Sequence, residues 1–289
     1  MTSANGAVAA GADQGPRPAP GNPAEFVRPA PRRAAGTMAG RAVGPMAGRD
    51  AARIGEGLAR ARDRIAVACQ AAGRPASDVR LLLAAKEQSA GAIRAAIVAG
   101  ACLIGENRVQ ELAAKGPALA DLPHRAHVIG PLQSNKINAA LRWASCVETV
   151  DTLRLAERLA ARAGARPGGI GVMVQVNTSG EPTKSGVEPA AAADLACRVA
   201  GLPGLRLEGF MTVGLNSDRA AAVARSYAAL REIRDAVVAS GAPGATGAVD
   251  LSMGMSGDLE IAIAEGATIV RLGTAVFGPR PRRDGTLGR

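Results

Sequence analysis

The chain has 289 residues, of which 47% are hydrophobic and 2% aromatic, and its formal net charge is +10. One α/β barrel of roughly 250 residues would use nearly all of this length. No apolar run approaches the roughly 20 residues that a membrane-spanning helix needs. The first residues also lack the apolar segment of a secretory signal. We therefore expect a soluble cytoplasmic protein with no membrane partner.

The positive charge leaves a nucleic-acid-binding module open as an alternative function. The basic residues, however, stand singly among Asp and Glu, and Trp143 and Tyr227 are isolated from the three Phe. Stacking on bases requires aromatic residues interleaved with the basic ones. The pattern therefore favours an Arg-rich surface and no nucleic-acid partner.

Four cysteines and two histidines are the residues that could bind a soft metal ion: Cys69, Cys102, Cys146, Cys197, His124 and His127. No two cysteines form a CxxC pair, and neither histidine is near a cysteine in the sequence. We therefore expect neither a zinc site nor a disulfide framework, and no metal.

Residues 1–47 are rich in Ala, Gly and Pro and predict a disordered tail, because proline lacks a backbone donor and glycine costs entropy when ordered. From residue 50 the amino-acid pattern changes. Residues 50–72 carry Ile54, Leu58, Ile65 and Val67 at helical spacing, so they predict an amphipathic helix. We place the folded domain at residues 48–282.

The rest of the domain alternates between short apolar runs and helical patterns. The runs predict strands at Val79–Ala85, Cys102–Ile104, Ala126–Ile129, Cys146–Val150, Val172–Val176, Leu205–Phe210, Val249–Leu251 and Ile269–Leu272. The helical patterns cover 89–99, 107–115, 134–143, 152–164, 187–200, 218–239 and 257–265. Near-continuous apolar strands indicate parallel strands buried on both faces. The order predicts a (β/α)8 TIM-type barrel, with a doubly wound open sheet as the alternative.

In such a barrel, the functional residues lie at the carboxyl ends of the strands. Lys86 directly follows the first apolar strand. A partly desolvated lysine amine can lose its proton and attack a carbonyl carbon to form a Schiff base. The alternative is a lysine that extends into solvent at a strand end.

Polar segments follow several other strands. Asn107, after the second strand, could cap the next helix or bind a ligand. Residues 130–136 could bind an anion or cap a helix, and residues 177–186 form either a mobile flap or a surface turn. His127 lies within a strand, where a core role is the commoner one.

Two glycine-, serine- and threonine-rich segments follow the seventh and eighth strands. The first is residues 252–258, and the second is Gly273-Thr274. Many barrels bind phosphate at these two positions, because backbone N–H groups can close around an oxyanion there. Arg271 lies inside the last strand and needs an acceptor, because a buried unpaired guanidinium is costly.

Six segments in order resemble the pyridoxal-phosphate homeostasis proteins, from about residue 50 to Pro279. They are Leu83-Ala84-Ala85-Lys86, residues 105–111 (GENRVQE), residues 127–136 (HVIGPLQSNK), Lys184-Ser185-Gly186, residues 252–256 (SMGMS) and Arg271-Leu272-Gly273-Thr274. Any one segment is weak, but six in sequence are specific.

The resemblance implies the fold-type III barrel of alanine racemase without that enzyme's second domain. It implies that pyridoxal 5′-phosphate is held as a Schiff base by Lys86, with Asn107 beside the ring and Arg271 facing the pyridine nitrogen. The loop Ser252, Gly254, Met255, Ser256, together with Gly273 and Thr274, would hold the phosphate. The chain departs from the family pattern at Ala85, Glu87, Gln88 and Arg108, which could alter loop packing or cofactor release.

Three functions therefore stand as hypotheses. The first is a carrier that buffers or delivers pyridoxal phosphate, with no robust catalytic activity, to acceptors that include pyridoxal-phosphate-dependent apo-enzymes. The second is a weak amino-acid racemase, which would need a second base besides lysine; the one tyrosine, Tyr227, is expected in helix packing. The third is the nucleic-acid-binding module. We expect a monomer, with a weak dimer as the alternative.

Overall fold

The computed structural model describes residues 48–164 and 166–278. Eight parallel strands close into a barrel in sequence order, β1 to β8, so the predicted barrel is confirmed and the open-sheet alternative is wrong. The predicted tail, residues 1–47, and the last predicted domain residues, 279–282, lie outside the described residues.

The strands agree with the apolar runs to within one or two residues at each end. They are β1 Arg80–Ala84, β2 Leu103–Glu106, β3 Arg125–Val128, β4 Cys146–Val150, β5 Ile170–Gln175, β6 Leu205–Met211, β7 Asp250–Ser252 and β8 Ile269–Leu272. Some of the differences involve charged residues. Two of these residues are paired: Glu106 pairs with Lys115 on the helix side of the strands, and Arg125 pairs with Glu208, which an apolar pattern cannot show.

The helices also follow the predicted pattern. They are α1 Gly48–Ala71, α2 Ala90–Val98, α3 Val109–Leu119, α4 Ile137–Trp143, α5 Leu153–Ala163, α6 Pro189–Ala200, α7 Ala220–Ala239, α8 Leu259–Ala264 and α9 Thr274–Phe277. Two short 3-10 helices, η2 Ala76–Asp78 and η3 Ser134–Lys136, precede β1 and α4. Ser89 and Thr152 begin α2 and α5 as expected of N-caps, each accepting a hydrogen bond from a backbone N–H.

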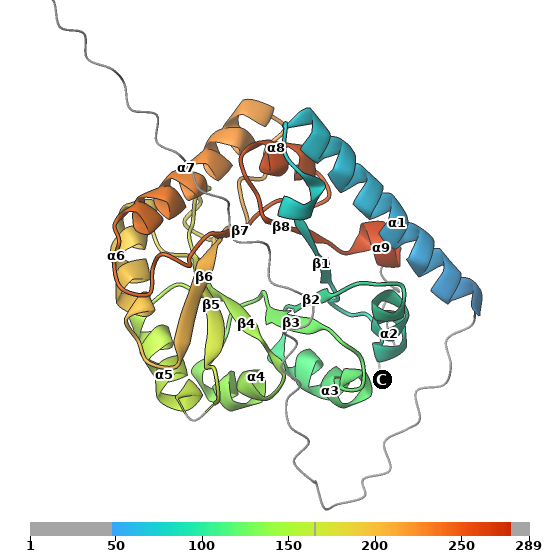
Figure 1. Ribbon diagram of the computed structural model, residues 1–289, viewed down its shortest axis with the longest axis horizontal. Coiled ribbons are helices and arrows are strands. Elements are labelled where there is room, and N and C mark those ends of the chain that lie inside the picture. The colour runs from blue at the N-terminus through green and yellow to red at the C-terminus, as the bar shows by residue number, and fades with distance from the viewer. Residues whose placement is uncertain (1–47, 165, 279–289) are drawn as a thin grey trace, which may run out of the picture.

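The helices form a ring around the strands, and α1 lies outside this ring along α2, α8 and α9 (Figure 1). Ile54, Leu58 and Ile65 bury the inner face of α1. Val67 does not share that face and is 66% exposed, so its expected place on the apolar face is wrong. None of the described helices is long and apolar enough to cross a membrane.

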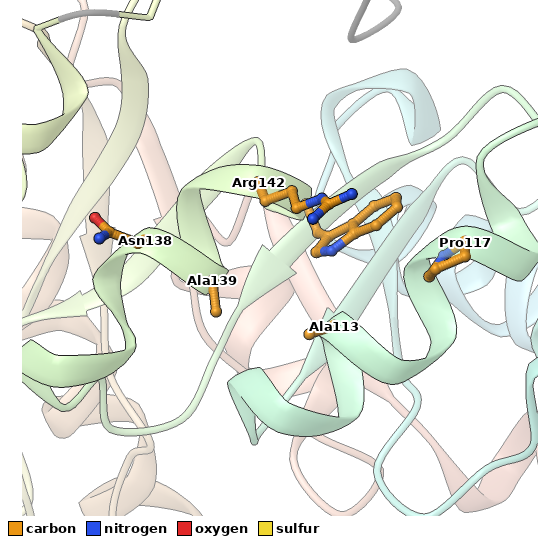
Figure 2. A pocket seen from close by; sticks show the side chains of 6 residues that line it. Ala113, Pro117, Asn138, Ala139 and Arg142 are labelled. Carbon is orange, nitrogen blue, oxygen red and sulfur yellow. The ribbon is translucent and has the colours of Figure 1, made fainter. Parts of the chain in front are cut away.

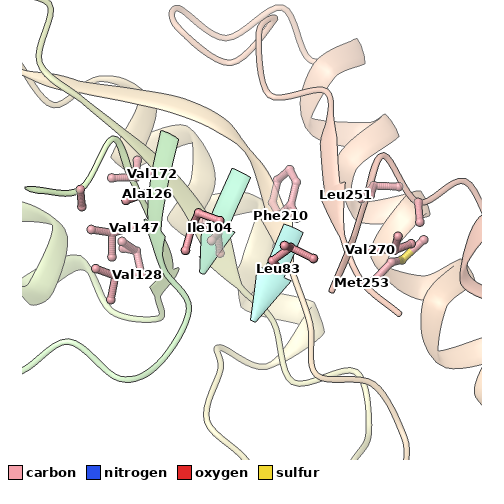
Figure 3. Close-up of a cluster of buried hydrophobic side chains, with 14 of the residues drawn as sticks. Leu83, Ile104, Ala126, Val128, Val147, Val172, Phe210, Leu251, Met253 and Val270 are labelled. Atoms are coloured by element: carbon pink, nitrogen blue, oxygen red, sulfur yellow. The ribbon is translucent and has the colours of Figure 1, made fainter. Parts of the chain in front are cut away.

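The main core lies between the strands and the helix ring. Strand residues that point outward, such as Leu83, Ile104 and Val147, are buried there (Figure 3). Because side chains alternate along a strand, the neighbouring residues point into the barrel. A second apolar cluster fills that interior and comprises Leu82, Leu103, Cys146, Met173, Met211 and Ile269.

Ion pairs also fill the interior, near the starts of the strands. Arg125 donates to Glu208 at 3.1 Å, Arg206 donates to Glu208 at 2.9 Å, and Arg80 pairs with Asp250. The Glu208 and Asp250 carboxylates are each 16% exposed, whereas their arginine partners are between 34% and 52% exposed. Partly exposed ion pairs thus occupy the end of the barrel where the strands begin.

Candidate functional site

The carboxyl ends of β1, β2, β7 and β8 meet at one end of the barrel, which we call the barrel mouth. Ala84 pairs with Gly105, and Leu83 pairs with Leu272. The segments that carry Lys86, Asn107 and Gly273 therefore leave neighbouring strands side by side. Parallel strands bring these segments together although they are far apart in the sequence.

Lys86 follows β1 within a tight turn. The Gln88 amide donates to the Ala85 carbonyl at 3.0 Å, which closes the turn around Lys86 and Glu87. The Lys86 side chain is half-buried. Within residues 48–164 and 166–278, its amine makes no hydrogen bond or ion pair. A lysine held at a barrel mouth without a partner is available to a ligand.

Asn107 follows β2 and is half-buried. The residue at the N-cap of α3 is Arg108, which makes no side-chain capping bond. The expectation that Asn107 caps this helix is therefore wrong. Its amide has no hydrogen-bond partner among the described residues, so the ligand-binding alternative keeps its support.

Hydrogen bonds to Asp258 fix the segment after β7. The Asp258 carboxylate accepts a hydrogen bond from the Met255 backbone N–H at 2.6 Å and another from the Tyr227 hydroxyl at 2.7 Å. Gly254 has a φ of 91°, which a residue with a Cβ rarely adopts, and a Cβ there would lie 2.5 Å from the Ala262 side chain. Ser256 is exposed, and its hydroxyl and backbone N–H have no partner in the described part of the chain.

The segment after β8 approaches β1 closely. A Cβ on Gly273 would lie 2.9 Å from the Ala84 carbonyl oxygen, so the close approach depends on glycine. Thr274 begins α9 and is exposed, with its hydroxyl unpaired among the described residues. Free donors on Ser256 and Thr274 therefore lie on segments that leave adjacent strands.

A buried polar network lies beneath the mouth. Arg271 donates to the Ser252 hydroxyl at 3.0 Å and to the carbonyls of Ser252 and Thr212, both at 2.7 Å. The Ser252 hydroxyl donates to Glu148 Oε2 at 2.6 Å, and His127 Nδ1 donates to Glu148 Oε1 at 2.6 Å. Arg271 thus finds the acceptors that the sequence required of it. The Ser252 hydroxyl is already engaged within this network.

The pKa values of both Glu148 and Arg271 are lowered in this network, for different reasons. Burial acts to raise the pKa of Glu148, but the hydrogen bond and charge of His127, the charge of Arg271 and the Ser252 hydroxyl hold it below its usual value. Burial lowers the pKa of Arg271, against which the Glu148 carboxylate acts. The sequence missed Glu148, whose only signal was a glutamate inside an apolar run.

A second interior cluster brings together His127, Cys146 and Glu208, whose ligand atoms all lie within 4.8 Å of one another. His127 Nε2 is buried without a partner. However, both Glu208 oxygens accept hydrogen bonds from Arg125. Burial also raises the pKa of the Cys146 thiol well above its usual value, whereas a metal ion requires the thiolate. The cluster is therefore better described as an ion-paired core.

Two loops predicted from the sequence are hydrogen-bonded to neighbouring elements. Ser134, in residues 130–136, accepts a hydrogen bond from Arg158 at 2.8 Å and caps no helix. In residues 177–186, Lys184 donates to the Gly214 carbonyl at 2.8 Å and pairs with Glu181. The second loop is thus tied to the segment that follows β6.

The described surface also has a hollow between α3 and α4 (Figure 2). It is lined by Ala113, Pro117, Asn138, Ala139, Arg142 and Trp143. The Arg142 guanidinium lies 5.4 Å from the centre of the Trp143 ring. None of the residues predicted to bind a ligand lies there, so the barrel mouth remains the candidate site.

Tyr227 bears on the racemase hypothesis. Its side chain is fully buried, as the packing role predicted, and its hydroxyl donates to Asp258. Burial and this hydrogen bond raise the pKa of the phenol. A second base acting on a substrate must reach it, whereas Tyr227, on α7, is buried and bonded to Asp258 in the segment after β7.

The fold and the site define a single-barrel protein with a lysine and anion donors at its mouth. Comparison with known proteins identifies its family. Residues 57–281 match the family described as alanine racemase, N-terminal domain. A pyridoxal phosphate homeostasis protein of Pseudomonas aeruginosa is 44% identical over 227 residues, which cover 78% of this chain and 96% of that protein.

Solved structures agree. A crystal structure described as an unknown protein from Bifidobacterium adolescentis is 45% identical, with a TM-score of 0.77 over 80% of this chain and 97% of that one. PipY of Synechococcus elongatus, solved with pyridoxal phosphate bound, is 34% identical, with a TM-score of 0.67 over 78% of this chain and 100% of that one. The chain belongs to the pyridoxal phosphate homeostasis protein family.

Proposed function

We propose that this protein binds pyridoxal 5′-phosphate through Lys86 and acts in pyridoxal phosphate homeostasis, holding the cofactor reversibly for buffering or delivery. One observation carries the proposal. The half-buried Lys86 amine has no partner within the described residues, and it follows a strand adjacent to the one that leads to Gly273 and Thr274. Pyridoxal phosphate requires an amine that can bind its aldehyde and hydrogen-bond donors that can bind its phosphate.

The donors fit a phosphate group. The hydroxyls of Ser256 and Thr274 are exposed and unpaired within the described residues, as is the Ser256 backbone N–H. Gly254 and Gly273 let the two segments approach their neighbours more closely than a side chain would allow. The Met255 N–H is bound to Asp258, so Met255 would shape the loop rather than donate from its backbone.

Asn107 and Arg271 are suited to contact the pyridine ring of the cofactor. Asn107 has an unpaired amide at the end of β2, and the Arg271 guanidinium is fixed by Ser252 and Thr212. Arginine does not give up its proton in proteins, so a ring nitrogen that faces Arg271 would remain an acceptor. A ring in that state is a poor electron sink. Ser252 would serve the site by orienting Arg271, and the arrangement favours holding the cofactor over transforming a substrate.

Bound pyridoxal phosphate supplies an aldehyde that a neutral primary amine attacks reversibly, with loss of water. Lys86 provides that amine, and the turn from Ala85 to Gln88 fixes where it starts. The phosphate donors orient the cofactor, so that release depends on a competing amine or on loss of the phosphate contacts.

The relatives support this proposal. Relatives that are 44% and 39% identical over 78% of the chain are named pyridoxal phosphate homeostasis proteins, and PipY was solved with the cofactor bound. We extend the proposal to a cytoplasmic monomer that passes the cofactor to pyridoxal-phosphate-dependent apo-enzymes. Mixing the loaded protein with such an apo-enzyme across a dialysis membrane and in one compartment would separate direct transfer from transfer through solution.

The central test uses absorbance and mass spectrometry. The parent protein, incubated with pyridoxal phosphate, should gain a visible band that borohydride removes, and peptide mass should place the reduced adduct on Lys86. Lys86→Ala should gain no such band. A colourless parent, or an adduct on another lysine with Lys86→Ala unchanged, would overturn the proposal.

A further inference from the structure

Lys115, on α3, reaches back from the helix ring to the barrel mouth. Its ammonium donates to Glu106 Oε1 at 2.7 Å, to Glu111 Oε2 at 3.0 Å and to the Ala85 carbonyl at 3.2 Å. The Lys115 side chain is only 13% exposed. Three acceptors use all three protons of the ammonium, so this lysine is fixed in one geometry.

Glu111 bonds to the other side of the same turn. Its Oε2 accepts the backbone N–H of Glu87 at 3.0 Å while it pairs with Lys115. Glu111 and Lys115 are four residues apart on α3 and so share one helix face. The two side chains therefore bond the Ala85 carbonyl and the Glu87 amide, which lie immediately before and after Lys86.

The turn that they bond has an unfavourable backbone. Glu87 has a φ of 63°, the one positive value for a non-glycine residue among those described. A Cβ makes this left-handed conformation costly, and such strain persists only where the surroundings impose it. The hydrogen bond from Gln88 to Ala85 closes the turn, and it requires Glu87 to stay in this conformation.

Glu106 anchors the arrangement from the next strand. It is the last residue of β2 and is 2% exposed, and it directly precedes Asn107. Its Oε1 accepts from Lys115, whereas its Oε2 is buried without a partner. A buried carboxylate at this point holds the Lys115 ammonium in place. Its backbone also continues into a candidate ligand-binding residue.

We propose that Lys115 and Glu111 are positioning residues for Lys86, which hold the turn Ala85–Gln88 in its strained form so that the Lys86 amine is preorganised for the cofactor. This inference rests on the proposed attachment at Lys86. All the hydrogen bonds of Lys115 and Glu111 named above go to protein groups. The two residues act by removing the conformational freedom that Lys86 would otherwise lose on binding.

The test compares three variants with the parent. Glu111→Gln weakens the pair but keeps an acceptor for Glu87. Lys115→Met removes all three hydrogen bonds, and Glu106→Gln/Lys115→Met removes them without leaving a buried charge. Arg198→Met is the control, because Arg198 pairs with Asp194 at the same spacing on α6. We expect Lys115→Met and the double variant to raise the dissociation constant for pyridoxal phosphate about tenfold, Glu111→Gln to raise it less, and the control to leave it unchanged.

Glu87→Gly separates positioning from general stability. Glycine adopts a positive φ without cost, so adding Glu87→Gly to either Lys115 variant should restore most of the affinity. Amide hydrogen exchange of residues 85–88 in the cofactor-free protein should be faster in Lys115→Met and slower again after Glu87→Gly is added. A merely structural role for Lys115 would predict no rescue by a glycine at position 87.

Two failures remain distinguishable. If the reduced adduct is absent from Lys86 in the parent, the proposed function fails. If the adduct is on Lys86 but the folded Lys115 variants keep the parental affinity and the parental exchange rates at residues 85–88, the positioning inference fails alone.

Discussion

The Nδ1 atom of His127 lies 2.6 Å from Oε1 of Glu148, and both side chains are fully buried inside the barrel. Neither residue is at the mouth itself. Through Ser252, the pair fixes the Arg271 guanidinium from beneath. The orientation of a candidate ligand-binding residue therefore depends on a charge four strands away around the barrel.

Replacing Glu148 should be costly. Glu148→Gln removes the carboxylate nearest the buried Arg271 guanidinium, and leaving a buried charge without compensation typically costs about 3 kcal/mol or more. We expect that loss in the free energy of unfolding, measured with chemical denaturant. The exposed Glu157→Gln is the matched control and should change little. An unfolding free energy for Glu148→Gln within about 0.5 kcal/mol of the parent would contradict the importance of the pair.

The hydroxyls of Ser256 and Thr274 should contribute to phosphate binding. Each of Ser256→Ala and Thr274→Val should raise the dissociation constant for pyridoxal phosphate about tenfold, because a hydrogen bond to a charged group is worth about 1.5 kcal/mol. Titration followed by absorbance measures this. Ser77→Ala, an exposed residue that precedes β1 at the other end of the barrel, is the control. Equal affinities in all four proteins would argue against a phosphate site here.

Tyr227 should support the loop after β7 rather than act as a base. Tyr227→Phe removes one hydrogen bond to Asp258, which also holds the Met255 amide. We expect a loss of about 1.5 kcal/mol in the free energy of unfolding and a dissociation constant for pyridoxal phosphate about threefold higher.

Under the racemase hypothesis, turnover of D- to L-alanine above the rate of free cofactor should occur in the parent and vanish in Tyr227→Phe. We expect no such turnover in either protein.

The stability of the protein should depend on the ionisation of Glu106. Burial raises the pKa of Glu106 from 4.5 to about 7; Lys115 acts against this shift and Glu111 adds to it. The folded state therefore binds this proton more tightly than the unfolded chain does. The resulting stabilisation is complete below pH 4.5 and is lost as the pH rises through the folded-state pKa of about 7.

Glu106→Gln isolates this contribution. The unfolding free energy of the parent, relative to that of Glu106→Gln, should fall by up to about 3 kcal/mol between pH 5 and pH 8, given about 1.4 kcal/mol for each pKa unit. Denaturant titrations of both proteins across that range measure the difference. Parallel pH profiles would show that Glu106 titrates normally in the folded protein.

Much of the fold followed from the sequence. The apolar runs placed all eight strands, with β4 and β8 at their observed bounds, because parallel strands covered by helices must be apolar on both faces. The predicted helical ranges 89–99 and 152–164 begin at the residues that the structure shows as N-caps, Ser89 and Thr152, because capping is a local interaction. The same local reasoning was wrong at Asn107. A cap at Asn107 would require α3 to begin at residue 108, whereas it begins at Val109.

The sequence by itself determined that Lys86 ends a buried strand and that glycine- and hydroxyl-rich segments follow the last two strands, because these are properties of consecutive residues. Only the tertiary structure decided that Glu148 fixes Arg271, and that Lys115 and Glu111 bond the turn around Lys86. Barrel closure brings β4 and β7 side chains into one interior, and α3 back over β1. No spacing in the chain encodes those distances, because they depend on how many strands close the barrel and at what register.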